Sequence, residues 1–312
     1  MGRPRLTQAR TIRACLSADG DPKLRDKKPE ETSMRNDRLE IRPVSGAVGA
    51  EILGIDLADI DSARIDAIKA AFHEHGVVFF RDQKLTPEQH IAFAEKIAPI
   101  NVNRFFKSAT GYPQIAEVRK EPDQKRNIGG GWHTDHSYDQ VPALGSILLA
   151  REVPERGGDT MFAAMWLAYE ALSDGLKKTL EGMRAVHSSR HVFGTTSAYA
   201  KEMGSRLGNP EAATQDAVHP VVIRHPESGR KVLYVNRGFT THFEGWTADE
   251  SKPLLDYLYA HGARPEFQTR FQWKDGSMAI WDNRSTWHLA VNDYHGERRL
   301  MHRITLEGTP LG

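Results

Sequence analysis

A short stretch in the middle of the chain places a histidine and an aspartate at a spacing that suits metal chemistry. It reads Gly131-Trp132-His133-Thr134-Asp135. If this stretch is a β-strand, His133 and Asp135 project from the same face, because side chains alternate between the two faces of a strand. One imidazole and one carboxylate are two of the three ligands of the facial arrangement that holds non-haem Fe(II) and leaves positions open for oxygen. A lone His-x-Asp pair is common without a metal, so it needs a third ligand to carry weight.

The second imidazole has to come from a distant part of the chain. The sequence holds 14 histidines, so availability alone singles out none of them. His288 stands out because it follows residues 278–284, which read as a buried strand running into a polar turn. A ligand on a strand of a rigid barrel is held more accurately than one on a loop. Several other histidines fall on predicted helices, where packing or surface roles are expected: His73, His75, His90 and His261.

A run of cations follows near the end of the chain. Arg299 and Arg303 are four residues apart, which places both on one face if the segment is a strand. Two inward-facing guanidinium groups are unfavourable unless they meet anions, and a carboxylate is their natural partner. The alternative is a solvent-exposed edge strand whose arginines point into water.

Composition narrows the class of protein. Of the 312 residues, 39% are hydrophobic and 27% charged, which is ordinary for a soluble globular protein and enough for one large domain. The net charge of +1 argues against a nucleic-acid binder that relies on a broad basic field. No run of 18 apolar residues occurs, so no membrane partner is expected. The single cysteine, Cys15, excludes an intramolecular disulfide and a cysteine-built metal site, and it suits a cytoplasmic protein.

The first 37 residues differ from the rest of the chain. They are rich in arginine and lysine and have little aliphatic periodicity, and the first 18 contain no Asp or Glu. We expect an unpacked extension over residues 1–37, followed by a single domain over residues 38–312. The same composition would fit an over-extended start, with Met34 as the alternative initiator, and a transit-like segment is the other hypothesis.

Short strands outnumber helices along the remainder. Helices are predicted over residues 61–75, 86–97, 165–172, 174–182 and 247–261, and capping boxes open the second and the last of them. Strand patterns cover residues 39–44, 77–80, 114–119, 146–150, 218–224, 232–235, 267–273, 278–281 and 299–305. This balance favours a sandwich, barrel or jelly roll. The polar stretch 190–216 is predicted to be a long loop, for which a lid over a site is the natural role.

Taken in order, four motifs resemble the taurine dioxygenase-like family of 2-oxoglutarate-dependent oxygenases. They are Trp132-His133-Thr134-Asp135, Gly157-Gly158-Asp159-Thr160, Trp281-Asp282-Asn283-Arg284 with His288, and Arg298-Arg299-Leu300-Met301-His302-Arg303. The spacing also fits, with 27 residues from His133 to Thr160, 11 from His288 to Arg299 and 15 from His288 to Arg303. The resemblance runs over residues 39–308, and the ordered set is far more specific than any one motif.

The resemblance implies a mainly β protein with flanking helices, a double-stranded β-helix or jelly roll. It implies that His133, Asp135 and His288 hold Fe(II), and that Thr160 and Arg299 bind the far carboxylate of 2-oxoglutarate. With O2 as the other co-substrate, such an enzyme releases succinate and carbon dioxide as it hydroxylates its substrate.

The substrate end of the pocket is less well specified. The resemblance places Arg303 near the anionic group of the substrate and Trp281 beside the iron. Taurine dioxygenase holds its sulfonate with a histidine at the position of Asn103, which argues against taurine here. His136 completes the candidate substrate contacts, although it faces away from His133 on a regular strand.

The flanking residues widen the choice of anion. The segment 105–113 resembles the phenoxypropionate herbicide branch of the family. Lys107 or Arg104 could join Arg303 around a carboxylate or sulfonate, or both could be plain surface charge.

The leading hypothesis is therefore an oxygenase for a small organic anion of the sulfonate, sulfate ester or aryloxyalkanoate type. One alternative keeps the chemistry but assigns a larger natural-product intermediate as substrate. Another is a non-catalytic metal-binding jelly roll, in which Thr160 and Arg299 would have no role. Members of the family often form dimers or tetramers, so a homo-oligomer is expected, but the sequence indicates no interface.

Overall fold

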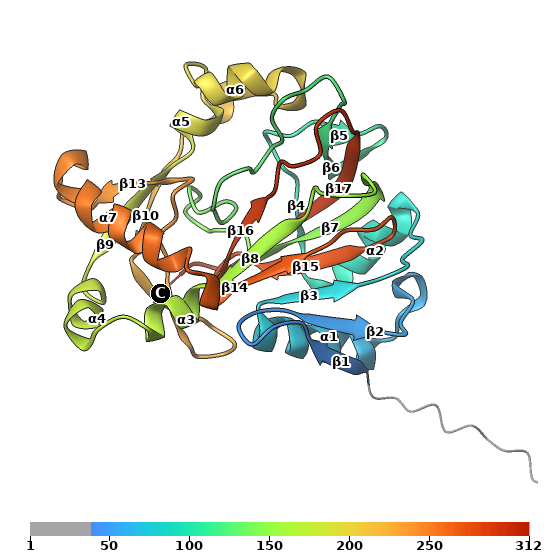
Figure 1. Ribbon diagram of the computed structural model, residues 1–312, viewed down its shortest axis with the longest axis horizontal. Coiled ribbons are helices and arrows are strands. Elements are labelled where there is room, and N and C mark those ends of the chain that lie inside the picture. Colours follow the sequence, from blue (N-terminus) through green and yellow to red (C-terminus); the bar gives the residue numbers. More distant parts are fainter. Residues whose placement is uncertain (1–38, 312) are drawn as a thin grey trace, which may run out of the picture. The chain divides into compact units, whose positions relative to one another are not determined.

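A nine-stranded sheet forms the main layer of the structure (Figure 1). The computed structural model describes residues 39–311, and the extension predicted over residues 1–37 lies outside them. In spatial order the strands are β1 (Glu40–Pro43), β2 (Ala50–Leu53), β3 (Val77–Phe80), β15 (Met278–Asp282), β7 (Gly145–Glu152), β17 (Arg299–Leu306), β6 (Tyr112–Lys120) and β5 (Ser108–Ala109), with β4 (Ile100–Asn101) also paired to β17. β2 and β3 run parallel, and the other pairs are antiparallel.

A smaller sheet packs against the main one and completes the jelly roll. It consists of β14 (Gln268–Phe271), β8 (Thr160–Ala164) and β16 (Thr286–Ala290), with β8 in the middle. Phe79 and Leu148 of the large sheet share one buried cluster with Phe162 and Trp287 of the small one. Because side chains alternate along a strand, neighbouring residues such as Ile147 face the opposite side of the large sheet.

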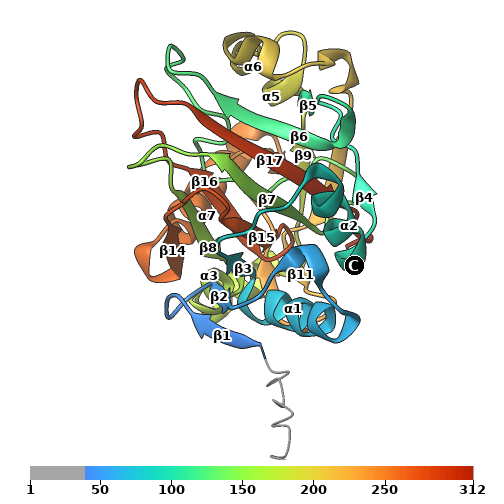
Figure 2. The ribbon, with the colours of Figure 1, turned by 90° about the vertical axis from the view of Figure 1, so that its right-hand side faces the viewer.

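Two helices cover that opposite side. They are α1 (Ser62–His75) and α2 (Pro87–Ile97), which lie together against the sheet in Figure 2. The apolar face of α1 includes Ile68 and Phe72, which pack with Phe93 of α2 and with the strands beneath. The large sheet is therefore buried on both faces, which fixes the strands that carry the site.

The signals predicted at the helix ends are present. The Asp61 side chain accepts a hydrogen bond from the Arg64 N–H at the start of α1, and Gly76 ends that helix in the left-handed region with φ of 71°. Capping boxes open α2 at Thr86 and α7 (Ala248–Gly262) at Thr247. The two other predicted helices are α3 (Met165–Glu170) and α4 (Asp174–Leu180).

Residues 218–224 and 190–216 differ from their predicted secondary structure. Residues 218–224 do not form one strand, because β10 (Asp216–Pro220) pairs with β9 (Arg184–Ser188) while β11 (Val222–Arg224) pairs with β12 (Lys231–Leu233). The segment 190–216 is not a structureless loop, since it contains α5 (Arg190–Phe193), α6 (Ala198–Met203) and two short 3-10 turns, Gly204–Arg206 and Pro210–Ala212. In Figure 1, α5 and α6 lie above the small sheet, and β13 (Thr240–Phe243) pairs with β9.

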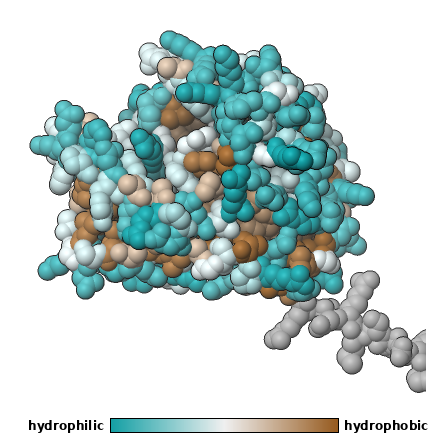
Figure 3. All heavy atoms as spheres, in the orientation of Figure 1, coloured by the Kyte–Doolittle hydropathy of each residue, from teal (hydrophilic) through white to brown (hydrophobic). Residues whose placement is uncertain are grey.

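The surface is largely polar on the face drawn in Figure 3, where hydrophobic residues show in separate patches. Among residues 39–311, no helix has the length and apolar character that a membrane crossing requires.

Candidate active site

His133 and His288 are brought together by a pair of backbone hydrogen bonds between distant segments. His288 lies on β16, and its N–H and C=O groups pair with the C=O and N–H of His133 at 2.8 and 3.1 Å. The strand predicted around His133 is wrong, because this single bridge leads directly into a turn that contains Asp135. The turn nevertheless brings the carboxylate to the imidazoles, with 3.7 Å from each histidine Nε2 to a carboxylate oxygen of Asp135.

The protonation of these three groups suits metal binding. The Nδ1 of His133 lies 2.7 Å from the Gly131 carbonyl oxygen, so Nδ1 carries the hydrogen and Nε2 presents its lone pair. Burial, with His133 beside it, lowers the pKa of His288 well below its ordinary value, which keeps that imidazole neutral. Burial alone would raise the pKa of Asp135, but the charge of Arg303 and the nearby histidines holds it far below its usual range. Neutral imidazoles and an ionised carboxylate are the forms that bind a cation.

The three residues open onto a cavity of about 430 Å³. Its wall is rich in aromatic side chains, including Phe106, Trp132, Tyr138, Phe193 and Phe239. Trp281 of β15 also lines it, with its ring centroid 4.7 Å from that of His288. Part of the wall comes from α5 and α6, so the segment predicted as a lid does border the site.

Arg299 and Thr160 face the same cavity from neighbouring parts of the two sheets. Arg299 is 4% exposed, and its Nε and Nη2 atoms are buried without a hydrogen-bond partner in the described part of the chain. The Thr160 hydroxyl accepts a hydrogen bond of 3.0 Å from the Trp273 Nε1, which leaves its own hydrogen free to be donated. The close approach of Arg299 accounts for the glycine at position 158. A side chain there would crowd the arginine, because its Cβ would lie 3.2 Å from the Arg299 Cδ. A buried guanidinium without a counter-charge is strongly unfavourable, so this end of the cavity is built to receive an anion.

Arg303 is the second inward-facing arginine. The alternative of an exposed edge strand is wrong, because β17 lies between β6 and β7 and both Arg299 and Arg303 are buried. The Arg303 Nη1 is 3.3 and 3.4 Å from the two Asp135 oxygens, and the guanidinium lies 4.3 Å from the centre of the Phe106 ring. Its Nε atom has no partner among the residues described.

His136 and Asn103 form a linked pair at the edge of the cavity. His136 lines the cavity, but Asn103 does not. The Asn103 Oδ1 accepts hydrogen bonds from the backbone N–H groups of Phe105 and Phe106 at 3.0 and 3.1 Å, so its Nδ2 is the atom 3.1 Å from the His136 Nε2. The His136 Nδ1 lies 2.9 Å from an Asp139 oxygen. Both nitrogens of His136 are therefore occupied, and the substrate contacts predicted for these two residues stay predictions.

The other cations considered at the substrate end lie elsewhere. Arg104 forms an ion pair with Asp139 at 2.5 Å, and Lys107 is exposed. Neither residue lines the cavity.

The comparisons with known proteins agree with this geometry. The family model described as "Taurine catabolism dioxygenase TauD, TfdA family" matches residues 40–305. The chain belongs to this family. It is 38% identical to an alkylsulfatase of Acinetobacter baylyi, over 87% of this chain and 86% of that protein. It is 32% identical to an alpha-ketoglutarate-dependent sulfate ester dioxygenase of Pseudomonas putida, over 88% of this chain and 91% of the relative.

A solved structure supports the fold independently. A crystal structure described as a putative alpha-ketoglutarate-dependent taurine dioxygenase from Burkholderia xenovorans superimposes with a TM-score of 0.74 at 35% identity, covering 87% of this chain and 93% of that one. The protein is thus a 2-oxoglutarate-dependent dioxygenase with a jelly-roll fold, as the ordered motifs predicted.

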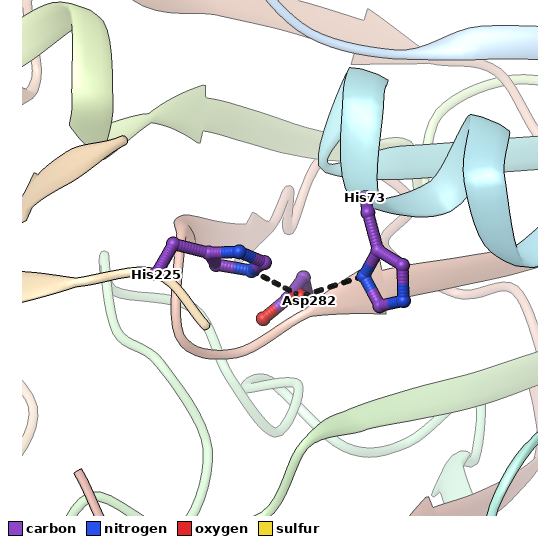
Figure 4. Close-up of side chains that lie close together, drawn as sticks. All are labelled: His73, His225 and Asp282. Carbon is purple, nitrogen blue, oxygen red and sulfur yellow. Dashed lines mark hydrogen bonds and ion pairs between the residues drawn. The ribbon is translucent and has the colours of Figure 1, made fainter. Parts of the chain in front are cut away.

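This dioxygenase contains a second cluster of two histidines and an aspartate, which the sequence did not reveal. His73 of α1, His225 and Asp282 at the end of β15 meet in Figure 4. The His225 Nε2 is 2.9 Å from the Asp282 Oδ2, and the His73 Nδ1 is 3.9 Å from it. None of these residues lines the cavity described above.

The partners of the second cluster differ from those of the first. The Ser228 N–H donates to the His225 Nδ1 at 3.1 Å, so Nε2 carries the hydrogen and donates it to Asp282. Arg284 donates to both Asp282 oxygens, at 3.0 and 2.6 Å. Burial alone would raise the pKa of Asp282, but Arg284 and His225 hold it well below the ordinary value. This aspartate already has its counter-charge, and we assign the cluster to folding rather than to metal binding.

Tyr138 and Phe239 are cavity residues that the sequence reasoning missed. A signal for Tyr138 was present, since it lies three residues after Asp135. Phe239 comes from a loop before β13 that has no motif of its own, so its place in the wall depends entirely on the fold.

Proposed function

We propose that this protein is an Fe(II)-dependent member of its family that hydroxylates a small organic anion. His133, Asp135 and His288 are the residues that would hold the iron. The observation that carries the proposal is the buried, unpartnered guanidinium of Arg299 in the same cavity as this triad. A metal site alone would not need it, whereas a co-substrate carboxylate supplies the missing charge.

The donor set fits iron in character. Two imidazoles and one carboxylate are the ligands typical of non-haem Fe(II) oxygenases that leave positions open. When bound, the iron would supply the oxygen chemistry that couples decarboxylation of 2-oxoglutarate to hydroxylation of the substrate. The protein would supply the binding, orientation and exclusion of water that direct this chemistry to one substrate carbon.

Arg299 and Thr160 are proposed to bind the far carboxylate of 2-oxoglutarate. The Arg299 guanidinium has two free donor nitrogens and Thr160 has a free hydroxyl hydrogen, so together they can satisfy both oxygens of a carboxylate. The surrounding protein excludes water, which strengthens each charge-assisted hydrogen bond.

Arg303 is proposed to attract the anionic group of the substrate. It is the other buried arginine of the cavity, and its Nε is unpartnered in the described residues. The aromatic wall would enclose the apolar part of the molecule. Hydroxylation of the carbon next to a sulfur or oxygen atom would then let the product fall apart, as sulfonates, sulfate esters and aryloxyalkanoates allow. A cytoplasmic location and a homo-oligomer remain predictions.

The substrate class is tested by succinate release. Fe(II) protein with 2-oxoglutarate and O2 should release succinate only when one of hexyl sulfate, hexanesulfonate or 2-phenoxypropanoate is added. Release with larger neutral natural products and with none of the three anions would favour the alternative of a natural-product substrate.

The co-substrate site is tested by a matched pair of arginine variants. Arg299→Ala should weaken 2-oxoglutarate binding about 10- to 100-fold, because about 1.5–3 kcal/mol is lost with a charge-assisted hydrogen bond. The metal-to-ligand absorption band of the anaerobic Fe(II) protein reports this binding. Arg298→Ala is the control, since the adjacent Arg298 pairs with Glu121 and Glu152 at the surface. Unchanged binding in Arg299→Ala would contradict the role proposed for Arg299.

A further inference from the structure

Tyr138 has a hydroxyl that no other described residue uses. The residue is 2% exposed and lines the cavity. Its hydroxyl makes no hydrogen bond within residues 39–311, and its oxygen is not among the atoms shut off from solvent. A buried tyrosine usually finds a partner for its hydroxyl. The free position is therefore open to a molecule in the cavity.

The ring of Tyr138 is held firmly. Phe239 contacts it edge-on at 4.7 Å between ring centroids, and Phe105 and Phe193 pack against it at 6.0 and 5.9 Å. The Arg104 guanidinium lies 5.3 Å from its centre. Because the ring is fixed on several sides, the hydroxyl is a preorganised donor that loses little freedom when it binds.

Burial keeps the Tyr138 hydroxyl protonated, so it can donate to an anion. Burial raises the pKa of Tyr138 above its ordinary value, as do the charges of Asp139 and Asp135, while Arg104 and Arg303 act in the opposite direction. His136, the other polar side chain nearby, has both ring nitrogens occupied by Asn103 and Asp139. The Tyr138 hydroxyl and the Arg303 guanidinium both line the cavity and both keep donor capacity for a bound anion.

We propose that the Tyr138 hydroxyl binds the anionic group of the substrate together with Arg303. Arg303 supplies the charge and Tyr138 supplies a directed hydrogen bond. The pair selects an oxoanion with at least two acceptor oxygens, whether sulfate ester, sulfonate or carboxylate. Tyr138 is then a specificity residue rather than part of the wall. This inference rests on the proposed function.

The test compares two tyrosines with free hydroxyls. Tyr138→Phe removes only the oxygen from the cavity. Tyr234→Phe is the matched control, because the Tyr234 hydroxyl likewise has no partner in the described residues, yet Tyr234 does not line the cavity. Binding of hexyl sulfate, hexanesulfonate and 2-phenoxypropanoate is measured by calorimetry on the anaerobic Mn(II) protein with 2-oxoglutarate, and succinate release is measured separately on the Fe(II) protein.

Tyr138→Phe should weaken binding of the preferred anion about 10- to 100-fold, the range for a hydrogen bond to a charged group. Its affinity for 2-oxoglutarate should be unchanged, which shows that the site is folded, and Tyr234→Phe should bind both ligands like the wild type. Equal anion binding by Tyr138→Phe and wild type would overturn the inference but leave the proposed function intact. A wild-type protein that binds and turns over none of the three anions would overturn both.

Discussion

Residues 39–311 hold two clusters of two histidines and one aspartate, and the differences between them bear on which cluster is suited to a metal. In both, the donor atoms lie within 4.8 Å of one another. At the active site the Nδ1 of His133 faces a carbonyl oxygen, so Nε2 is free to bind a cation. In the second cluster the Nδ1 of His225 accepts a backbone N–H, so Nε2 carries a hydrogen.

The counter-charges separate the two clusters further. Arg284 binds Asp282 through two hydrogen bonds as short as 2.6 Å, which neutralises that carboxylate. Arg303 touches Asp135 only at 3.3 Å or more, and this aspartate opens onto the cavity. Proximity of donor atoms is therefore weak evidence that a cluster binds a metal. The hydrogen-bond partners of His133, His225 and the two aspartates favour metal binding at the first cluster and an ion pair at the second.

The largest expected effect is on the first cluster. Asp135→Ala should abolish metal binding and succinate release, because two imidazoles alone form an incomplete site. Metal content by elemental analysis and succinate by chromatography measure the two losses. His225→Ala, in the second cluster, is the control and should keep one metal ion per chain. Loss of metal from His225→Ala with retention in Asp135→Ala would show that the second cluster, and not the first, binds the metal.

The second cluster should respond through stability instead. Asp282→Asn removes the closer and more buried of the two carboxylates that pair with Arg284, leaving only Glu227 at 3.0 Å, and should lower the free energy of unfolding by at most about 3–5 kcal/mol. Urea unfolding followed by circular dichroism measures the change. A stability equal to that of the wild type would show that this ion pair contributes nothing to the fold.

The stability that Asp282 contributes should depend on pH, because the pKa of Asp282 is lowered in the folded protein. A carboxylate whose folded pKa lies below its unfolded value stabilises the fold fully above about pH 4, and this contribution is lost as the pH falls below that value. The stability difference between wild type and Asp282→Asn should stay constant from pH 8 to about 5.5 and shrink near pH 3.5. Urea unfolding at these three values tests the sign, and a difference that grew in acid would contradict it.

A smaller effect is expected from the support of the active-site carboxylate. The Ser146 hydroxyl donates a hydrogen bond of 3.1 Å to Asp135. Ser146→Ala should weaken metal binding about 10-fold or somewhat more, the usual consequence of removing a group that orients a ligand. Competition with a fluorescent chelator gives the affinity. Thr286→Ser, which keeps the hydroxyl bonded to the Asp282 carbonyl, should leave metal affinity unchanged.

The sequence carried the local signals and the order of the motifs. The capping residues Asp61, Thr86 and Thr247 specify helix starts through contacts within one turn, so they could be recognised directly. The prediction that Arg299 and Arg303 lie on one strand and share a face is also confirmed, because strand periodicity is local. These features predicted that both arginines face one cavity.

The features that could not be predicted from the sequence depend on contacts between distant parts of the chain. His133 lies in a bridge made only by pairing with His288, so no local pattern could distinguish it from a strand. Pro220 and Val222 belong to strands with different partners, which a continuous apolar run does not indicate. The encounter of His73, His225 and Asp282 needs a helix, a hairpin and a central strand to pack together, and the sequence gives no sign of it.

The central claim is that His133, Asp135 and His288 hold the metal. The most direct test is an anomalous difference map from crystals soaked anaerobically with Mn(II) and 2-oxoglutarate. We predict one strong peak within bonding distance of these three residues, with 2-oxoglutarate density reaching Arg299 and no peak at His73, His225 and Asp282. A peak at the second cluster, or none at the first, would contradict the account.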